Sequence, residues 1–364
     1  MTAPHRMLEY VRETPQALEK TLRCQTAVEA IAARAAQRGI QRLIVVGSGS
    51  SYTAALIAEP SLTYHGRLPT QVLEPVELAF LAPRLVDSRT MVVAVSRTGS
   101  SGHVIQALID AKERGALAVG MTGNPDSALA RHAEFPLFTQ EGPEEAFPTT
   151  KSVMTCAGLL IRLGLALARK DDTEAVATLG ELEAFPAKLS IALPGLEHEV
   201  QSAIPWIMAH DQAAVAGTLS NFGAAMEGAM KIQEAAGLPA CGYSTDGLLH
   251  GAVGTLDARW LVIVLATHND RDATGDLLRV VRALGAHTMS IVEPDLGSRL
   301  DDEPTLDLGF RIDTFIAGLA SLTPLHLLSY YLAVARNIDP DSPLGTKTVL
   351  RAIRPPVKER ADSL

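Results

Sequence analysis

Cysteine is scarce in this chain, which has three among its 364 residues. Cys24, Cys156 and Cys241 lie far apart and form neither a CxxC pair nor the spacing of a zinc site. Scattered cysteines in odd number are typical of a protein whose thiols stay reduced, because disulfide frameworks use paired cysteines in an oxidising compartment. The sequence therefore argues against a disulfide-stapled secreted protein, and we expect a cytoplasmic one.

Positive charge is also sparse. The formal net charge is −9, and no block of lysine and arginine marks a nucleic-acid surface. The first ten residues, MTAPHRMLEY, lack the apolar core of a signal peptide. The longest apolar stretch, residues 153–170, is short for a bilayer and carries Arg162, so we expect a buried helix there. Nucleic acid and membrane are not expected partners, whereas a local loop can still bind a small anion.

Hydrophobic residues make up 47% of the chain and follow an alternating pattern. Runs rich in β-branched residues alternate with segments such as 101–115 and 273–285, which have helical spacing and a closing glycine. Strands covered by helices on both faces are apolar throughout, so the pattern predicts parallel sheets in an α/β fold. The strand-like runs lie at residues 42–47, 90–96, 116–122, 260–267 and 287–293.

The two halves of the chain resemble each other at a nearly constant offset. GSGSSYTAAL from Gly47 matches GTLSNFGAAM from Gly217, and the helix-ending Gly115 matches Gly285, both at an offset of 170 residues. The run MVVAV matches WLVIV at an offset of 169. We therefore predict two tandem, doubly wound, flavodoxin-like parallel-sheet domains.

The predicted organisation has four parts: an N-terminal lead (1–20), a first domain (21–190), a second domain (191–338) and a C-terminal tail (339–364). Two prolines and a glycine in residues 182–195 interrupt the helical pattern, so we expect the joint between the domains there.

Two loops rich in hydroxyl residues follow strand-like runs of the first domain, at residues 47–51 and 96–101. Helix starts at the carboxyl ends of parallel strands present N–H groups and a favourable dipole to an anion. These loops are therefore predicted to hold a phosphate. The matching loop of the second domain, residues 266–273, is bulkier and carries two acids, so phosphate binding is expected in the first domain only.

Other interpretations of these loops are open. Serine and threonine are common N-caps. GSGSSY also suggests a dinucleotide site, and Glu74 lies near the end of a possible second strand, but Tyr52 stands where that fingerprint needs its third glycine. A dinucleotide site would also leave the second loop without a role. A Walker loop is excluded, because no Gly-Lys-Ser/Thr follows.

Taken together, the motifs resemble the sugar isomerase (SIS) domain family, in particular the double-domain isomerase half of glucosamine-6-phosphate synthase and its stand-alone relatives. The likeness covers nearly the whole chain. It rests on MLEYVRETP, GSGSSY, SRTGSS, EEAFPTTKS, the stretch MEGAMKIQEAAGLPACGYSTDGLLHGAV, and DSPLGTKTV in the tail.

The resemblance implies roles for particular residues. The sugar phosphate would bind the hydroxyl groups of Ser50, Ser51, Ser96, Thr98 and Ser101, with Arg97 in place of a family glutamine. Thr149 and Lys231 would lie near the sugar. Glu234 would move a proton between C1 and C2, His250 would open the ring, and Lys347 would form an imine with the ketose. No metal and no cofactor are implied.

The residues themselves fit this chemistry, although each candidate also has a purely structural interpretation. An aldose–ketose interconversion needs a base that serves two adjacent carbons, and Glu227, Lys231 and Glu234 share one helix face at spacings of four and seven. Such a stripe is also common as a solvated set of salt bridges. His250 would by default be a surface-loop histidine, and Lys347 an exposed tail lysine.

The expected activity follows from the resemblance. The isomerase pattern begins almost at the first residue, so we expect no glutaminase domain and hence the degradative reaction: glucosamine 6-phosphate to fructose 6-phosphate and ammonia. Gly247, where the synthase-like turn has glutamate, leaves the substrate open. Alternatives are a fructosamine-type 6-phosphate deglycase, a simple phosphosugar isomerase, and a non-catalytic phosphosugar sensor. A homodimer with the active site completed by the neighbouring subunit is also implied.

Overall fold

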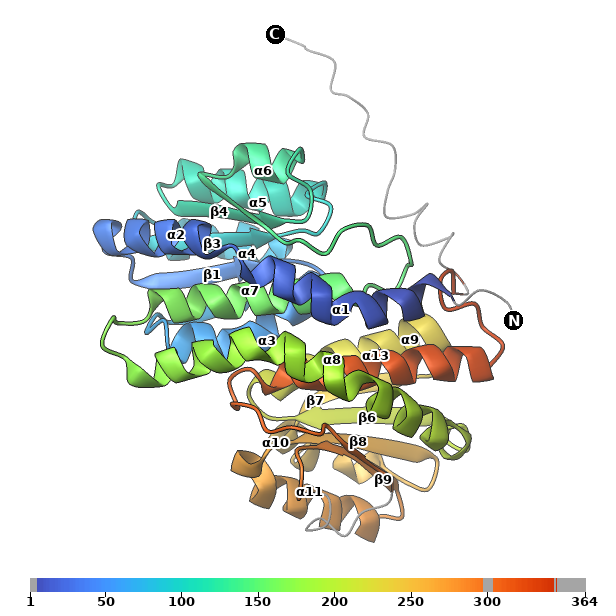
Figure 1. Ribbon diagram of the computed structural model, residues 1–364. Coiled ribbons are helices and arrows are strands. Elements are labelled where there is room, and N and C mark those ends of the chain that lie inside the picture. Colours follow the sequence, from blue (N-terminus) through green and yellow to red (C-terminus); the bar gives the residue numbers. More distant parts are fainter. Residues whose placement is uncertain (1–4, 297–303, 344, 346–364) are drawn as a thin grey trace.

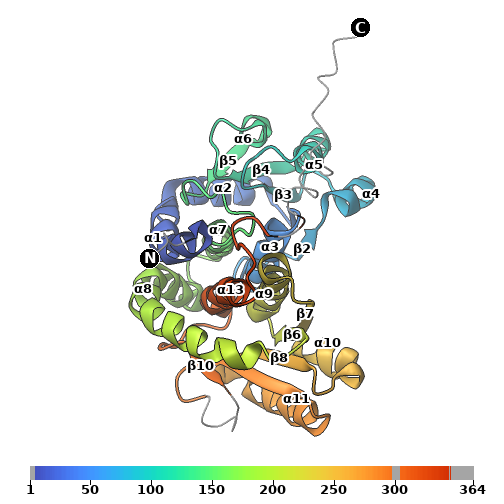
Figure 2. The ribbon, with the colours of Figure 1, turned by 90° about the vertical axis from the view of Figure 1, so that its right-hand side faces the viewer.

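Two parallel sheets enclose a layer of helices in the computed structural model, which describes residues 5–296, 304–343 and 345 (Figures 1 and 2). We call the half with the first sheet lobe 1 and the half with the second sheet lobe 2. The strands of lobe 1 are β1 (Arg42–Val46), β2 (Thr70–Leu73), β3 (Thr90–Val95), β4 (Leu117–Thr122) and β5 (Phe135–Phe138). The strands of lobe 2 are β6 (Gln212–Gly217), β7 (Ala240–Ser244), β8 (Trp260–Ala266), β9 (His287–Val292) and β10 (Thr305–Asp307).

The sheets have the same topology. Lobe 1 has the order β2-β1-β3-β4-β5, and lobe 2 has the corresponding order β7-β6-β8-β9-β10, all strands being parallel. This is the flavodoxin-like order, with a switch point between the first and third strands of each sheet. The predicted fold class of two tandem doubly wound α/β domains is confirmed.

Helices lie on both faces of each sheet. The inner layer, between the sheets, contains α1 (Arg6–Leu22), α2 (Gln25–Arg38), α3 (Ser50–Tyr64), α7 (Lys151–Leu167), α8 (Thr173–Ile207), α9 (Ser220–Ala236) and α13 (Ala317–Ala335). Outside lobe 1 lie α4 (Pro75–Leu85), α5 (Gly102–Glu113) and α6 (Ala128–His132). Outside lobe 2 lie α10 (Thr245–Leu249) and α11 (Arg271–Ala283), with short 3₁₀ turns at Ala252–Thr255 and His268–Asp270.

Strand β1 shows why the apolar runs fold this way. Leu43 and Val45 belong to the large core cluster that fills the inner layer, whereas Ile44 and Val46 belong to the cluster under the outer helices of lobe 1. Successive side chains of a strand point to opposite faces, so a strand buried on both sides must be apolar at every position. The inner cluster takes residues from both sheets, and the two lobes therefore share one core.

The five predicted strand runs correspond to β1, β3, β4, β8 and β9, within a residue or so at each end. Four strands were not predicted: β5, β6, β7 and β10. Strands β5, β7 and β10 lie at sheet edges, where one side of the strand is unpaired and apolar side chains are less necessary. The sequence of β6, QAAVAG, is dominated by alanine, which lacks the β-branched signature.

The expected interruption at residues 182–195 is not found. The segment is helical throughout and forms part of α8, which runs for 35 residues and contains Pro186, Pro194 and Pro205. Each proline removes only one backbone hydrogen bond, and the buried side of α8 packs against α1 and α13. Tertiary packing thus outweighs the local signal. The proposed domain boundary at 190/191 falls inside this helix.

Helix α13 is long and apolar enough to cross a membrane, and it is the one such helix among the described residues. In this protein 89% of its apolar window is buried. The helix packs along α9 in the shared core, as expected of the central helix of a two-sheet protein. Helix α7, from the longest apolar stretch, is likewise a buried core helix, as predicted.

Candidate active site

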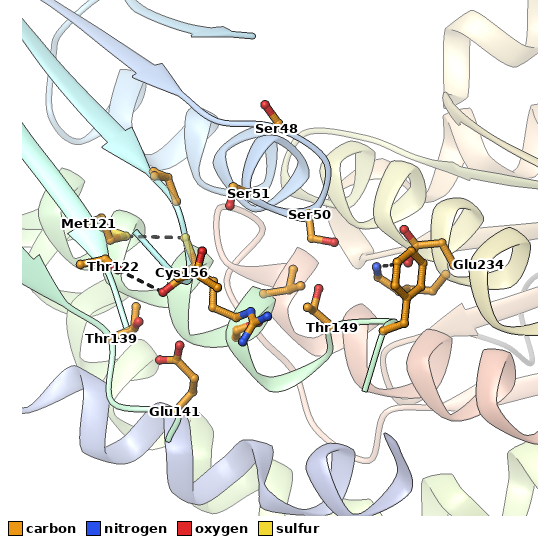
Figure 3. A pocket seen from close by; sticks show the side chains of 17 residues that line it. Ser48, Ser50, Ser51, Met121, Thr122, Thr139, Glu141, Thr149, Cys156 and Glu234 are labelled. Carbon is orange, nitrogen blue, oxygen red and sulfur yellow. Dashed lines mark hydrogen bonds and ion pairs between the residues drawn. The ribbon is translucent and has the colours of Figure 1, made fainter. Parts of the chain in front are cut away.

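A cavity of 260 Å³ opens at the carboxyl edge of the first sheet, beside the switch point between β1 and β3 (Figure 3). Lobe 1 supplies most of its wall, and α9 of lobe 2 closes one end. A crevice at this edge is where open α/β sheets bind ligands. The lining residues are Ser48, Ser50, Ser51, Val95, Arg97, Thr98, Met121, Thr122, Thr139, Glu141, Phe147, Thr149, Ser152, Val153, Cys156, Lys231 and Glu234.

The start of α3 forms one wall. Strand β1 ends at Val46, and the chain turns through Gly49, whose φ of 55° lies in the left-handed region, before the helix begins at Ser50. Ser50 and Ser51 therefore stand in the first helical turn, where their hydroxyl groups and the positive end of the helix dipole face the cavity; the Ser51 N–H donates to the carbonyl of Ser48 at 3.2 Å. This arrangement favours an anion without any fixed positive charge.

The loop after β3 forms the neighbouring wall. Arg97 and Thr98 line the cavity; an Nη1 of Arg97 donates to the carbonyl of Glu144 at 3.0 Å, and the hydroxyls of Thr98 and Ser100 are hydrogen-bonded at 2.7 Å. Gly99 has a φ of 62°, and a Cβ there would lie 2.2 Å from the Ser127 hydroxyl oxygen. The loop can pass this point only with glycine.

Two predicted phosphate ligands flank the cavity rather than line it. Ser96 is buried at the end of β3, where its N–H donates to the carbonyl of Met121 at 3.0 Å. Ser101 is the N-cap of α5, and its side chain makes no capping hydrogen bond. The cavity does bring together seven other predicted residues: Ser50, Ser51, Arg97, Thr98, Thr149, Lys231 and Glu234.

Helix α9 supplies the charged end of the cavity. Lys231 Nζ lies 2.5 Å from Glu234 Oε2 and 3.4 Å from Glu227 Oε1. The side chains of Glu227 and Lys231 are 0% and 1% exposed, whereas that of Glu234 is 27% exposed. The stripe is therefore not the solvated set of salt bridges that its spacing also allowed. Glu234 alone of the three has substantial access to the cavity or to solvent.

Glu227 also connects the lobes. The Ser50 hydroxyl donates to Glu227 Oε1 at 3.2 Å, and the Thr53 hydroxyl donates to Oε2. Burial raises the pKa of Glu227, and the neighbouring Lys231 charge and the Thr53 hydroxyl offset this only in part. Ser50, from the predicted anion-binding turn, is thus hydrogen-bonded to the carboxylate that faces the buried lysine.

Lys231 stays protonated. Burial alone would lower the pKa of its ammonium group, but the charges of Glu227 and Glu234 outweigh burial and raise the pKa. A fixed cation beside a partly exposed carboxylate can hold an oxygen that becomes negative while the carboxylate moves a proton.

His250 and Lys347 stand apart from this cavity. His250 is exposed at the C-cap of α10, on the outer side of lobe 2, and does not line the cavity (Figure 2). Lys347 lies outside the described residues. Among the described residues, no group of three or more histidine, cysteine or acidic side chains is arranged to hold a metal ion.

Several lining residues were not singled out from the sequence. Thr122 ends β4, and Thr139 and Glu141 follow β5, so recognition of β5 would have drawn attention to the polar residues at its carboxyl end. Ser48 lay within a predicted loop. Val95 and Met121 lie at the ends of the predicted strands β3 and β4, Phe147 and Ser152 lie in the quoted segment EEAFPTTKS, and Val153 and Cys156 come from α7. The residues missed are Ser48, Val95, Met121, Thr122, Thr139, Glu141, Phe147, Ser152, Val153 and Cys156.

Comparison with known proteins gives consistent results. The SIS domain profile matches residues 38–161 and 208–336, one segment in each lobe. The chain is 31% identical to the glutamine–fructose-6-phosphate aminotransferase (isomerizing) of Aeropyrum pernix, over 95% of this chain and 57% of that protein. The chain spans 57–58% of the length of the first curated relatives that it matches.

Solved structures share the fold. The C-terminal domain of glucosamine-fructose-6-phosphate aminotransferase from Francisella tularensis superposes with a TM-score of 0.82, at 21% identity, covering 94% of this chain and 99% of that one. Glucosamine-6-phosphate deaminase from Thermotoga maritima superposes with a TM-score of 0.73, at 22% identity, covering 93% and 97% of the two chains.

Proposed function

The chain belongs to the SIS domain family, and on that premise we propose that its cavity binds an amino-sugar 6-phosphate and deaminates it. The preferred substrate is glucosamine 6-phosphate, and the products are fructose 6-phosphate and ammonia. Relatives of this chain include glutamine–fructose-6-phosphate aminotransferases (isomerizing), and a structural neighbour is a glucosamine-6-phosphate deaminase. These names motivate the choice of substrate, and the cavity supports it independently.

One observation carries the proposal. A single cavity joins the helix start in lobe 1 that is predicted to bind an anion, at Ser50 and Ser51, to the buried cation and partly exposed carboxylate of lobe 2, Lys231 and Glu234. A sugar phosphate has the matching layout, with a dianion at one end and the reacting carbons at the other. The phosphate would bind to the start of α3 and to Thr98, with Arg97 close by.

The chemistry can then be assigned to residues. His250 would open the sugar ring. In the open aldehyde, Glu234 would remove the proton from C2 and return it to C1, while Lys231 stabilises the negative charge that develops on the C1 oxygen. The C1 oxygen takes up one proton, and the amine nitrogen gives one up as its double bond to C2 forms. The product of this transfer is a 2-imine. Water would add to its carbon, and ammonia would leave as the ketone forms. Deamination in this direction needs only water as a second reactant.

A substrate panel tests the proposal. Purified protein is given glucosamine 6-phosphate, galactosamine 6-phosphate, fructosamine 6-phosphate adducts and plain hexose 6-phosphates, and ammonia, free amine and ketose phosphate are measured. Ammonia and fructose 6-phosphate in equal amounts from glucosamine 6-phosphate are expected. Amine release from the adducts alone would indicate a deglycase, aldose–ketose interconversion alone an isomerase, and binding without turnover a sensor. Each of these results would replace the proposal.

The loop after β3 offers a separate test of the phosphate site. Gly99→Ala is expected to weaken binding of glucosamine 6-phosphate at least tenfold, an order-of-magnitude figure, because the new methyl would collide with Ser127 and force the Thr98 turn out of place. Gly102→Ala is the matched control, since a Cβ there meets no atom within 4 Å. Equal affinities of the two variants, measured by calorimetry, would refute a role for this loop.

The position of His250 gives a further prediction. If a second copy of the chain supplies this histidine, Glu234→Gln and His250→Ala are each inactive alone but restore activity when co-expressed and purified as mixed dimers. Each mixed dimer has one complete site out of two, so the purified mixed dimers are expected to recover about one half of wild-type activity. Mixed dimers that stay inactive would mean that His250 serves its own chain, and full activity of His250→Ala alone would mean that it has no part in catalysis.

A further inference from the structure

Glu141 is a buried carboxyl group in the wall of the cavity that the proposed chemistry does not use. It follows β5, is 6% exposed, and lies at the end of the cavity opposite Glu234, with its carboxyl group directed inward (Figure 3). Its Oε2 atom is buried and has no hydrogen-bond partner among the described residues. A buried acceptor without a donor is costly, so we expect this carboxyl group to meet a hydrogen-bonding group of a bound ligand.

Glu141 also lies against the predicted phosphate loop. Its Oε1 atom would be 2.2 Å from a Cβ on Gly123, so the carboxyl group packs directly on that glycine. Gly123 N–H in turn donates to the carbonyl of Arg97 at 3.0 Å, and Thr122 donates to the same carbonyl at 3.0 Å. Gly123 alone thus separates the Glu141 carboxyl group from the loop after β3, which is proposed to hold the dianion.

The charges around Glu141 do not cancel its own. Arg97 approaches from the loop after β3, but its guanidinium is bonded to the carbonyl of Glu144, and within the described part of the chain it forms no ion pair with Glu141. Glu144, on the same segment as Glu141, adds a second acid, and Cys156 faces the group from α7. Burial, with a smaller contribution from Glu144, raises the pKa of Glu141, against the opposing effects of Thr139 and Arg97.

We infer that Glu141 is a specificity-determining residue that makes anion binding in this cavity proton-linked: the ligand's phosphate enters together with a proton held by the Glu141 carboxyl group. This inference rests on the proposed phosphate site. An ionised Glu141 repels the dianion, whereas a neutral carboxyl group can donate a hydrogen bond to a phosphate oxygen. Binding is then strong below the pKa of Glu141 and weakens as the pH rises through it.

Inorganic sulfate is a suitable probe, because it remains a dianion across the working range while phosphate titrates. The dissociation constant for sulfate is measured by calorimetry from about pH 5.5 to about pH 8.5, for the wild-type protein, Glu141→Gln and the control Glu145→Gln. Glu145 carries the same change on the same segment, but its side chain is 64% exposed. In the wild type and the control, the dissociation constant is expected to rise about tenfold per pH unit above the pKa of Glu141.

Glu141→Gln is expected to bind sulfate with little dependence on pH, and more tightly than the wild type at the alkaline end. A second measurement needs no variant: at a pH where the dissociation constant rises tenfold per unit, calorimetry in two buffers of different ionisation enthalpy should show about one proton taken up per sulfate bound by the wild-type protein. A flat wild-type profile without proton uptake, or an unchanged slope in Glu141→Gln, overturns the inference while leaving the phosphate site intact. Failure of sulfate to bind at any pH, with glucosamine 6-phosphate also failing, contradicts the site itself.

Discussion

Glu234→Gln is expected to lower kcat for the deamination of glucosamine 6-phosphate by about 10²- to 10⁴-fold, the usual contribution of a positioned general base. The amide has nearly the same size as the carboxylate but cannot take the proton from C2. Because the Glu234 carboxylate is paired with Lys231 and not with the serines at the start of α3, the phosphate contacts are expected to remain in place. The variant should therefore bind the sugar phosphate with an affinity close to that of the wild type, and KM should change little.

Steady-state kinetics and calorimetry together check this result. Glu113→Gln is the control, since that carboxylate is exposed at the end of α5. An unchanged kcat in Glu234→Gln would show that another group moves the proton. A raised KM with kcat unaltered would reduce Glu234 to a binding residue. Loss of sugar-phosphate binding would mean that the carboxylate supports the shape of the cavity rather than its chemistry.

Lys231→Met is expected to destabilise the folded protein by about 3–5 kcal/mol, because it leaves buried Glu227 without its compensating charge. The effect should depend on pH. Without the lysine, the pKa of Glu227 rises further above its value in the unfolded chain. Stability is then greatest at low pH, where the carboxyl group is neutral in both states, and it is lost as the pH rises through the folded-state pKa.

Urea denaturation at acidic and at mildly alkaline pH measures this change, with the exposed Lys170→Met as control. The double variant Glu227→Met/Lys231→Met should be more stable than Lys231→Met alone, since no buried charge is then left unpaired. Equal stability of the single and double variants would show that Glu227 does not depend on the lysine. A destabilisation that is the same at both pH values would point to lost packing.

The fold was largely predictable because its signals are local and redundant. Strands buried on both faces, such as β3, are apolar at every position, and the same motif recurs 170 residues later. The edge strand β5 lacks that redundancy and was not predicted, so Thr139 and Glu141, which follow it, were not singled out. Proline is a strong helix-breaking signal in isolation, and only the packing of α8 against neighbouring helices shows that it is overridden.

The candidate site was predictable as a set of residue types but not as an arrangement. Spacing placed Glu227, Lys231 and Glu234 on one helix face, and it could not tell a solvated stripe from a buried one. Only the apposition of α9 and α3, from different halves of the chain, shows that Glu227 and Lys231 are inaccessible. His250 illustrates the converse: its sequence motif is recognisable, yet nothing local says which cavity it serves.

The hydroxyl of Ser50 has one further consequence. It stands in the turn where the anion is proposed to dock, and it also donates to Glu227, which holds the lysine beside Glu234. Anion binding at the start of α3 is thus linked to Glu234 through the side chains of Ser50, Glu227 and Lys231. Phosphate binding and the alignment of Lys231 and Glu234 are therefore coupled through the same side chains. A ligand without the phosphate group is expected to meet a less well-ordered Glu234 carboxylate.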